Sequence, residues 1–519
     1  MKVLLIGVDA GCQSVFDDLH ETDSIPNIRS LAADGISNEL ESQIPPWTPS
    51  AWPSIYTGVN PGKHGVYGFI TFDGYDWEVS TADHVRERTI WDLLDDHGRT
   101  SVVVNAPVTY PPAEIDGAIV PGFMSPEEPE CHPSGLFDEL VDAIGEYRVY
   151  PHYSRDDQQY SESEKMDEYC RLAEMRGEAF RYLTDRFDPD FGFVQFQKTD
   201  TVFHEFEGEP EHVRRIYEET DEQIGEILDS CDPDCVFLVS DHGIGPYDNY
   251  EFRVNEFLRD LGYLNVSADG KGMPSWNPIR NQLRDGESDR TWDIGLMGRL
   301  ARKASRVGVD PRQLVSRLEH VGLADLVRRH APDDVVRATS KQVDFETSTA
   351  YMRARTELGV RINLEGRDPN GIVPQAEYDQ VRARLIEQLR DVQTPDGKPV
   401  FDDVAPSETY FDGPYADEAV DIVTIPRDFS EFLSAQLLGE QFGPPTEPWN
   451  HKMDGIIIAT GDGIDTNASI DDAQLFDVAP TVMAAMGLPY SDRMDGSVLP
   501  LVDDTGTAPY LERGGSLLI

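Results

Sequence analysis

The amino-acid sequence predicts an α/β fold with a doubly wound, mostly parallel central sheet and an inserted cap module. Three apolar runs (residues 3–8, 191–196 and 235–239) end in polar residues, as buried strands do at their carboxyl ends. Helical stretches separate these runs, and such alternation is typical of a parallel sheet covered on both faces. With 519 residues, the chain is long enough for one large domain with an insertion, or for two domains.

The elements of the first half follow from periodicity and from glycine or proline boundaries. We expect helices at residues 25–35, 50–57, 89–98, 164–186 and 211–228. Further strands are expected at residues 39–43, 101–105 and 117–121, in addition to the three apolar runs.

The character of the chain changes after Gly245, where strands weaken and polar loops such as 269–289 appear. Helices are expected in this segment at 311–329 and 375–389. Strands at 419–425 and 454–459 and a closing helix at 477–487 then complete the core. The predicted organisation is a core over residues 1–247, an inserted cap or lid over 248–417, and the rest of the core over 418–519.

Charge is the unusual feature of the composition. The chain has 44 basic and 96 acidic residues, which gives a net charge of −52. No basic surface is available for phosphates, so nucleic acid and anionic membranes are excluded as partners. Acidic residues spread along the whole chain are typical of a halophilic, haloarchaeal protein, whose self-repulsion salt screens; an ordinary acidic enzyme is the alternative.

The five cysteines are odd in number and scattered, which indicates reduced thiols. The chain goes directly from Met1 into an apolar run too short for a signal sequence, and no run is long enough to span a membrane. A cytoplasmic protein is therefore expected, and its oligomeric state is left open.

Thr48 lies in the segment Pro-Pro-Trp-Thr-Pro-Ser, at the start of a short helix that Gly58 ends. A threonine at a helix start places its hydroxyl near backbone N–H groups and the positive end of the helix dipole, where an anion is held well. The simpler interpretation is that Thr48 only caps the helix.

Metal-type residues stand in short islands, each at the end of a predicted strand. Asp200 and His204 are four residues apart, so a helix places them on one face. Imidazoles combined with carboxylates favour Zn²⁺ or Mn²⁺ over Ca²⁺ or Mg²⁺. Taken singly, each island reads as a turn residue, a helix cap or a surface histidine. The islands are Asp9, Asp200 with His204, Asp241 with His242, and His451.

With these blocks in this order, the sequence resembles the alkaline phosphatase superfamily, and within it the nucleotide pyrophosphatase/phosphodiesterase branch and its group of predicted phosphohydrolases and phosphomutases. The resemblance covers nearly the whole chain. The motifs that match are Gly7-Val8-Asp9, the Thr48 block through Pro61-Gly62-Lys63-His64-Gly65, Asp200 to His204, Ser240-Asp241-His242-Gly243, His451 to Gly455, and Asp477-Val478-Ala479-Pro480-Thr481.

The resemblance implies a two-metal site and a small-molecule phosphate ester substrate, a phosphodiester or a nucleotide-type pyrophosphate. Thr48 would be the nucleophile and would form a covalent phospho-threonine. Asp200, His204 and His451 would bind one ion, and Asp9, Asp241 and His242 would bind the other together with Thr48.

One departure concerns the third residue after Thr48, which is an asparagine that holds a phosphoryl oxygen in the branch and is Ala51 here. Lys198, His64 and Asn450 are candidates for replacing it. The formylglycine motif of sulfatases is absent around Thr48. A phosphomutase using the same site is the main alternative, and a sulfate or phosphonate ester hydrolase is a further one.

Overall fold

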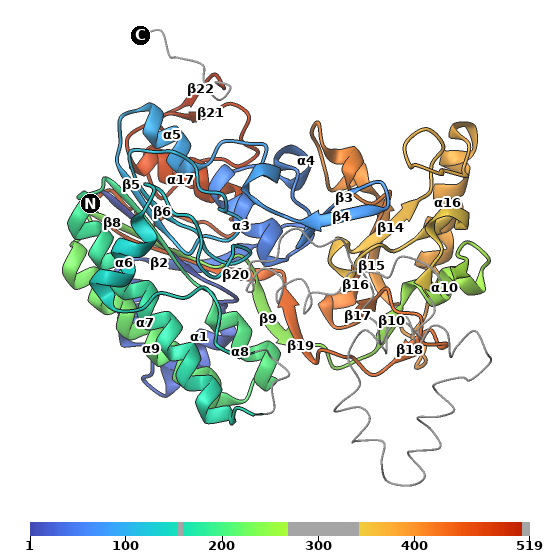
Figure 1. Ribbon diagram of the computed structural model, residues 1–519, viewed down its shortest axis with the longest axis horizontal. Helices are drawn as coiled ribbons and strands as arrows, with labels where there is room; N and C mark the ends of the chain where they lie inside the picture. Colours follow the sequence, from blue (N-terminus) through green and yellow to red (C-terminus); the bar gives the residue numbers. More distant parts are fainter. Residues whose placement is uncertain (154–158, 268–341, 511–519) are drawn as a thin grey trace.

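The computed structural model describes residues 1–153, 159–267 and 342–510. Figure 1 shows a larger lobe built on one sheet and a smaller lobe beside it. The predicted helix at 311–329 and the predicted polar loop at 269–289 lie outside the described residues.

The larger lobe contains a seven-stranded sheet in the order β2-β20-β8-β1-β7-β5-β6. β20 alone runs antiparallel to its neighbours, so the predicted mostly parallel sheet is confirmed. The strands are β1 (Val3–Val8), β2 (Ile36–Glu41), β5 (Ser101–Val104), β6 (Gly117–Val120), β7 (Phe191–Phe196), β8 (Cys235–Val239) and β20 (Asp454–Gly461).

Helices cover both faces of this sheet because its strands are apolar on both sides. Along β1, Leu4, Ile6 and Val8 pack into one core, and Val3 and Leu5 pack into the other. The first core is covered by α1 (Gln13–Glu21), α2 (Pro26–Asp34), α6 (Leu136–Ile144), α7 (Glu162–Phe187), α8 (Lys198–Phe206) and α9 (Pro210–Cys231). The second core is covered by α3 (Thr48–Thr57), α5 (Ile90–Asp96) and α17 (Val478–Ala485). The doubly wound α/β class is thereby confirmed.

The smaller lobe has its own apolar core and, within the described residues, sheets of four, three and two strands. The two-stranded sheet pairs β11 (Val266–Ser267) with β12 (Gln342–Val343). The first sheet has the order β13-β14-β16-β15, and the second β17-β10-β18. Its elements are β10 (Glu251–Arg253), α10 (Val254–Asp260), β13 (Ala350–Tyr351), β14 (Gly359–Ile362), α16 (Tyr378–Arg390), β15 (Phe401–Pro406), β16 (Ile422–Pro426), β17 (Phe432–Ser434) and β18 (Phe442–Gly443).

One boundary of the predicted domains needs correction. The strand expected to resume the core at residue 419 forms β16, which pairs with β14 and β15 in the smaller lobe. The chain re-enters the central sheet only at β20. The physical reason is that an apolar run indicates a buried strand but not the sheet to which the strand belongs, and this strand would be buried in either sheet.

Two antiparallel pairs connect the lobes in Figure 1. The hairpin of β3 (Ile70–Asp73) and β4 (Asp76–Val79) extends from the larger lobe, and its Tyr75 ring stacks on Phe345 at 5.7 Å. The pair of β9 (Gly243–Pro246) and β19 (Trp449–Lys452) lies between the lobes and leads into β20. Among the described helices, none combines the length and apolar character needed to cross a membrane.

Candidate metal centre

The predicted metal-type residues meet at one edge of the central sheet. The strands β8, β1 and β7 are neighbours and parallel, so their carboxyl ends lie side by side. Asp9 follows β1, Asp241 follows β8, and Asp200 lies in α8 just after β7. Because β20 runs the opposite way, it starts at this same edge, and β19 brings His451 there directly before it. Ligands commonly bind at this edge of open α/β sheets.

Three of these side chains, those of Asp9, Asp241 and His242, form a first group with the Thr48 hydroxyl. Thr48 Oγ1 lies 3.5 Å from Asp9 Oδ1 and 3.3 Å from His242 Nε2. The same His242 nitrogen lies 3.5 Å from Asp9 Oδ1 and 3.2 Å from Asp241 Oδ2. All four residues are buried.

A second group joins Asp200, His204 and His451. Asp200 Oδ1 lies 3.1 Å from His204 Nε2 and 3.4 Å from His451 Nε2, and the two histidine nitrogens are 3.1 Å apart. The predicted spacing within α8 therefore does place Asp200 and His204 on one helix face. The rings of His242 and His451 stack at 3.6 Å, so the two groups adjoin.

Both groups fit a divalent cation. Ligand atoms around zinc with bonds of about 2.0–2.1 Å stand about 3.3 Å from one another, and the separations in both groups lie close to that value. Several of the oxygens also lack the hydrogen bonds that buried carboxylates require. Within the described residues, three carboxylate oxygens have no hydrogen bond of normal geometry. They are both oxygens of Asp241 and Oδ1 of Asp200. A cation would satisfy these oxygens.

The backbone sets which ring nitrogen two of the histidines present. His242 Nδ1 donates to the carbonyl of Gly243 at 3.0 Å, and His451 Nδ1 donates to the carbonyl of Pro46 at 2.7 Å. Because Nδ1 holds the proton, Nε2 carries the lone pair and faces the group. Burial lowers the pKa of both imidazoles, which keeps them neutral and able to bind a metal.

The carboxylates are held close together in a buried site. Burial raises the pKa of Asp9, and the negative charges of Asp241 and Asp200 raise it further. Burial and the Asp200 charge likewise raise the pKa of Asp241. Burial acts to raise the pKa of Asp200 too, but the neighbouring His204 and His451 lower it overall. This excess of negative charge in a buried, low-dielectric site favours the binding of a cation.

Thr48 is the first residue of α3, and Trp47 occupies the cap position with no side-chain cap bond. The Thr48 hydroxyl is therefore directed to the metal-type residues instead of capping the helix. Gly58, with φ of 72°, ends α3 in the left-handed conformation expected of a glycine. The amides of Ser50 and Ala51 bond the Trp47 carbonyl, so they do not form the anion cradle suggested by the sequence.

Two residues that the sequence reasoning did not select fix Asp9. Gln195 Nε2 donates to Asp9 Oδ2 at 2.7 Å, and Asn105 Nδ2 donates to Gln195 Oε1 at 2.8 Å. This leaves Asp9 Oδ1 to face Thr48 and His242. Gln195 could have been noticed as the polar residue within the apolar run Phe-Gly-Phe-Val-Gln-Phe.

The three candidates for substrate binding all have partners within the protein. Lys198 donates to Gln197 and lies over the Tyr169 ring at 5.6 Å. The fully buried His64 contacts Ser54 through Nε2 and accepts from the Val66 amide through Nδ1. Asn450 donates to Glu447 and accepts from the His451 amide. Ala51 is part of α3, and its side chain is buried in the second core.

Comparisons with known proteins agree with this fold. A family model described as type I phosphodiesterase / nucleotide pyrophosphatase matches residues 3–304. The crystal structure of phosphonoacetate hydrolase from Sinorhizobium meliloti 1021 in complex with phosphonoformate is 14% identical, with a TM-score of 0.52 over 94% of this chain and 95% of that one. Wild-type alkaline phosphatase PafA is 13% identical, with a TM-score of 0.50 over 98% of this chain and 97% of that one. At these identities the structural likeness shows the fold. No curated protein matches the chain.

Proposed function

The chain belongs to the type I phosphodiesterase / nucleotide pyrophosphatase family, and we propose that it is a two-metal hydrolase of phosphate esters with Thr48 as nucleophile. One observation carries the proposal. The Thr48 hydroxyl lies within 3.5 Å of both Asp9 and His242, in a buried group of metal-type residues that adjoins a second such group.

We assign Asp9, Asp241, His242 and Thr48 to one ion, and Asp200, His204 and His451 to the other. Divalent ions in these positions would favour the alkoxide form of the hydroxyl and offset the charge of the phosphoryl group. The mixed imidazole and carboxylate set favours zinc, with manganese as the second choice.

The protein's own contribution is to hold the nucleophile in a fixed place. Thr48 is held at the start of α3, whose core residues pack against the central sheet. In the proposed reaction the Thr48 oxygen bonds to phosphorus while the bond to the leaving oxygen breaks, and the leaving group takes up a proton. Water then attacks the phosphorus of this intermediate and the bond to the Thr48 oxygen breaks, which restores the hydroxyl and releases the phosphate monoester that remains of a diester substrate.

The family supports diesters or nucleotide-type pyrophosphates as substrates. The phosphoryl-holding group is not expected at Ala51, whose side chain lies within the core. Lys198 and Asn450 stay candidates, since each is next to a proposed ligand region. We do not propose His64 as a substrate-binding residue, because both of its ring nitrogens have partners in a buried network.

The composition supports a high-salt, reducing compartment, such as a halophilic cytoplasm. The net charge of −52 is destabilising unless salt screens it. All five cysteines are free. The protein is therefore expected to be folded and active in molar salt.

The test compares wild type with Thr48→Ala and Thr48→Ser, using bis-p-nitrophenyl phosphate and p-nitrophenyl phosphate. We expect diester turnover by wild type, a loss of about 1,000-fold or more in Thr48→Ala, and partial activity in Thr48→Ser, since serine retains a hydroxyl. Metal content should be about two ions per chain in wild type. Full activity of Thr48→Ala would contradict the role of Thr48.

Turnover in ¹⁸O-labelled water separates hydrolysis from a mutase reaction. Hydrolysis places one solvent oxygen in the phosphate monoester released from a diester, whereas a mutase returns the phosphoryl group to a hydroxyl of the organic product without solvent oxygen. A released phosphate monoester without the label would contradict the proposed hydrolase.

A further inference from the structure

His204 differs from the other two histidines of the centre in its surroundings. The Nδ1 atoms of His242 and His451 donate to backbone carbonyls, which cannot be moved without moving the chain. His204 instead has a carboxylate side chain near its Nδ1, that of Glu447, with Oε2 at 4.0 Å. The His204 side chain is also the most exposed of the three, at 15% against 0% for His242 and 5% for His451.

Glu447 stands in the segment that leads into β19, four residues before His451. Its Oε2 also accepts a hydrogen bond from Asn450 Nδ2 at 3.0 Å. Its Oε1 accepts from the guanidinium of Arg355 at 2.9 Å. The carboxylate is therefore located between a candidate metal ligand on one side and an arginine on the other.

Arg355 comes from the smaller lobe, 92 residues before Glu447 in the chain. It begins the short helical turn Arg355–Glu357, close to β14. Its guanidinium lies over the Phe432 ring of β17 at 5.0 Å, which limits where the side chain can go. The ion pair with Glu447 thus ties a cation of the smaller lobe to the segment that leads into β19, the strand that contains His451.

We propose that Glu447 is a positioning residue for His204, and that Arg355 makes the smaller lobe part of the metal centre. A carboxylate that accepts the Nδ1 proton of a ligating histidine fixes the tautomer, turns Nε2 to the ion and raises its basicity. Arg355 holds Glu447 in reach of His204 and offsets the added negative charge. The inference rests on the proposed function, since it requires an ion at Asp200, His204 and His451.

The present separation of 4.0 Å is an ion-pair distance and too long for a hydrogen bond. The proposal includes the shortening of this contact when the ion binds, as functional hydrogen bonds in ligand-free sites are often long. Both side chains are partly exposed, His204 at 15% and Glu447 at 19%, so a small adjustment of either can shorten the contact.

The experiment titrates metal-free protein with Zn²⁺ in competition with a chromogenic chelator, which yields an affinity for each ion. The variants are Glu447→Ala, Glu447→Gln and Arg355→Ala. We expect Glu447→Ala to weaken one of the two ions by about 10- to 100-fold and to leave the other within about twofold. Glu447→Gln retains an acceptor oxygen and should fall between wild type and Glu447→Ala. Arg355→Ala should weaken the same ion by a smaller factor.

Glu418→Gln serves as the matched control. Glu418 also forms an ion pair between the lobes, with Arg86 at 2.5 Å, and within the described contacts this pair touches none of the candidate ligands. The control should bind both ions as wild type does. Diester kinetics give a second readout: kcat should fall in Glu447→Ala with little change in KM, because the ion and not the substrate contact is affected.

Three outcomes overturn the inference. Glu447→Ala could bind both ions as tightly as wild type, it could weaken both equally, or Glu418→Gln could show the same loss. If wild type binds two ions and hydrolyses the diester while Glu447→Ala matches it, only this inference fails. If wild type binds no ion, the proposed function fails with it.

Discussion

Nε2 of His204 and Nε2 of His451 lie 3.1 Å apart, although 247 residues separate the two histidines in the chain. The His451 nitrogen carries a lone pair, because Nδ1 of that ring donates to Pro46. Asp200 Oδ1 lies 3.1 Å and 3.4 Å from the two nitrogens. Converging acceptors of this kind are stable together when a cation lies among them.

Removal of metal is therefore expected to destabilise the protein. An ion that binds only the folded state adds about 4 kcal/mol when its free concentration is about 1,000 times Kd. EDTA should lower Tm, and added Zn²⁺ or Mn²⁺ should restore it. Mg²⁺ should restore it less, because it prefers oxygen ligands. Thermal unfolding in molar salt measures this, and identical Tm values with and without EDTA would contradict a metal centre.

Much of the larger lobe could be predicted because its strands are continuous apolar runs. β1, β7 and β8 occupy the same residues as the runs found in the sequence, and the polar residues after them are the ones that converge. The sequence places β16 in the central sheet, which is wrong, since its apolar residues do not indicate which strands it pairs with.

The parts of the site that could not be predicted depend on contacts between distant segments. Arg355 and Glu447 are 92 residues apart, and neither stands in a local pattern that marks a function. Gln195 is different, because a glutamine in a buried strand must find a partner and is therefore a visible signal. The sequence does not show that this partner is Asp9.

Loss of the Gln195 amide should weaken metal binding in the group around Thr48. Gln195→Leu keeps the volume but leaves Asp9 Oδ2 without its donor at 2.7 Å. We expect affinity for one ion to fall by about 10- to 100-fold, as for other partners of metal ligands. Chelator competition measures it. Gln223→Leu, which removes another buried glutamine that bonds Arg181 and Glu219, should leave the affinity unchanged. Equal effects in both variants would indicate general destabilisation.

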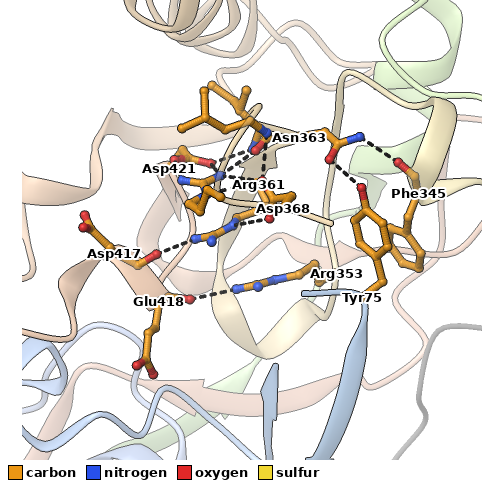
Figure 2. A network of polar contacts seen from close by, with 12 residues as sticks. Tyr75, Phe345, Arg353, Arg361, Asn363, Asp368, Asp417, Glu418 and Asp421 are labelled. Atoms are coloured by element: carbon orange, nitrogen blue, oxygen red, sulfur yellow. Dashed lines mark hydrogen bonds and ion pairs between the residues drawn. The ribbon is translucent and has the colours of Figure 1, made fainter. Parts of the chain in front are cut away.

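The buried Arg361 takes part in a network of polar contacts in the smaller lobe (Figure 2). Arg361 bonds the carbonyls of Asp417 and Ala419 and lies 3.8 Å from Asp368. Burial, followed by the charge of Arg353, lowers the pKa of Arg361 to about 10, so it stays charged at neutral pH. Arg361→Met should cost about 2–5 kcal/mol, because it leaves two buried carbonyls without their donor, at about 1–3 kcal/mol each. Asp368 keeps its bonds to Arg367 and to the Leu364 amide.

Urea unfolding in molar salt measures this cost, since salt screens exposed pairs far more than buried ones. Arg382→Met is the control. It removes an ion pair to the exposed Glu408 and should cost less than about 1 kcal/mol. A similar small cost for Arg361→Met would show that the buried network contributes little.

His64 terminates a chain of hydrogen bonds beneath α3. Because Nδ1 accepts from the Val66 amide at 3.2 Å, the proton is on Nε2, which donates to Ser54 at 2.9 Å. Ser54 then donates to Gln43 Oε1, and Gln43 Nε2 donates to Ser50. Every donor in this chain has an acceptor when His64 is neutral. A proton added at Nδ1 would face the Val66 N–H and break the chain.

Burial lowers the pKa of His64 from its ordinary value of 6.5 to about 3. The unfolded chain therefore binds a proton at a higher pH than the folded one, and stability falls as pH falls from 6.5 toward 3. By about pH 5 the loss should be about 2 kcal/mol, from about 1.4 kcal/mol per pH unit. Urea unfolding between pH 7 and pH 5 should give a shallower pH slope for His64→Gln, which cannot titrate, than for wild type. A constant offset between the two proteins with parallel slopes would mean that His64 does not carry the effect, because lost contacts alone shift the curve without changing its slope.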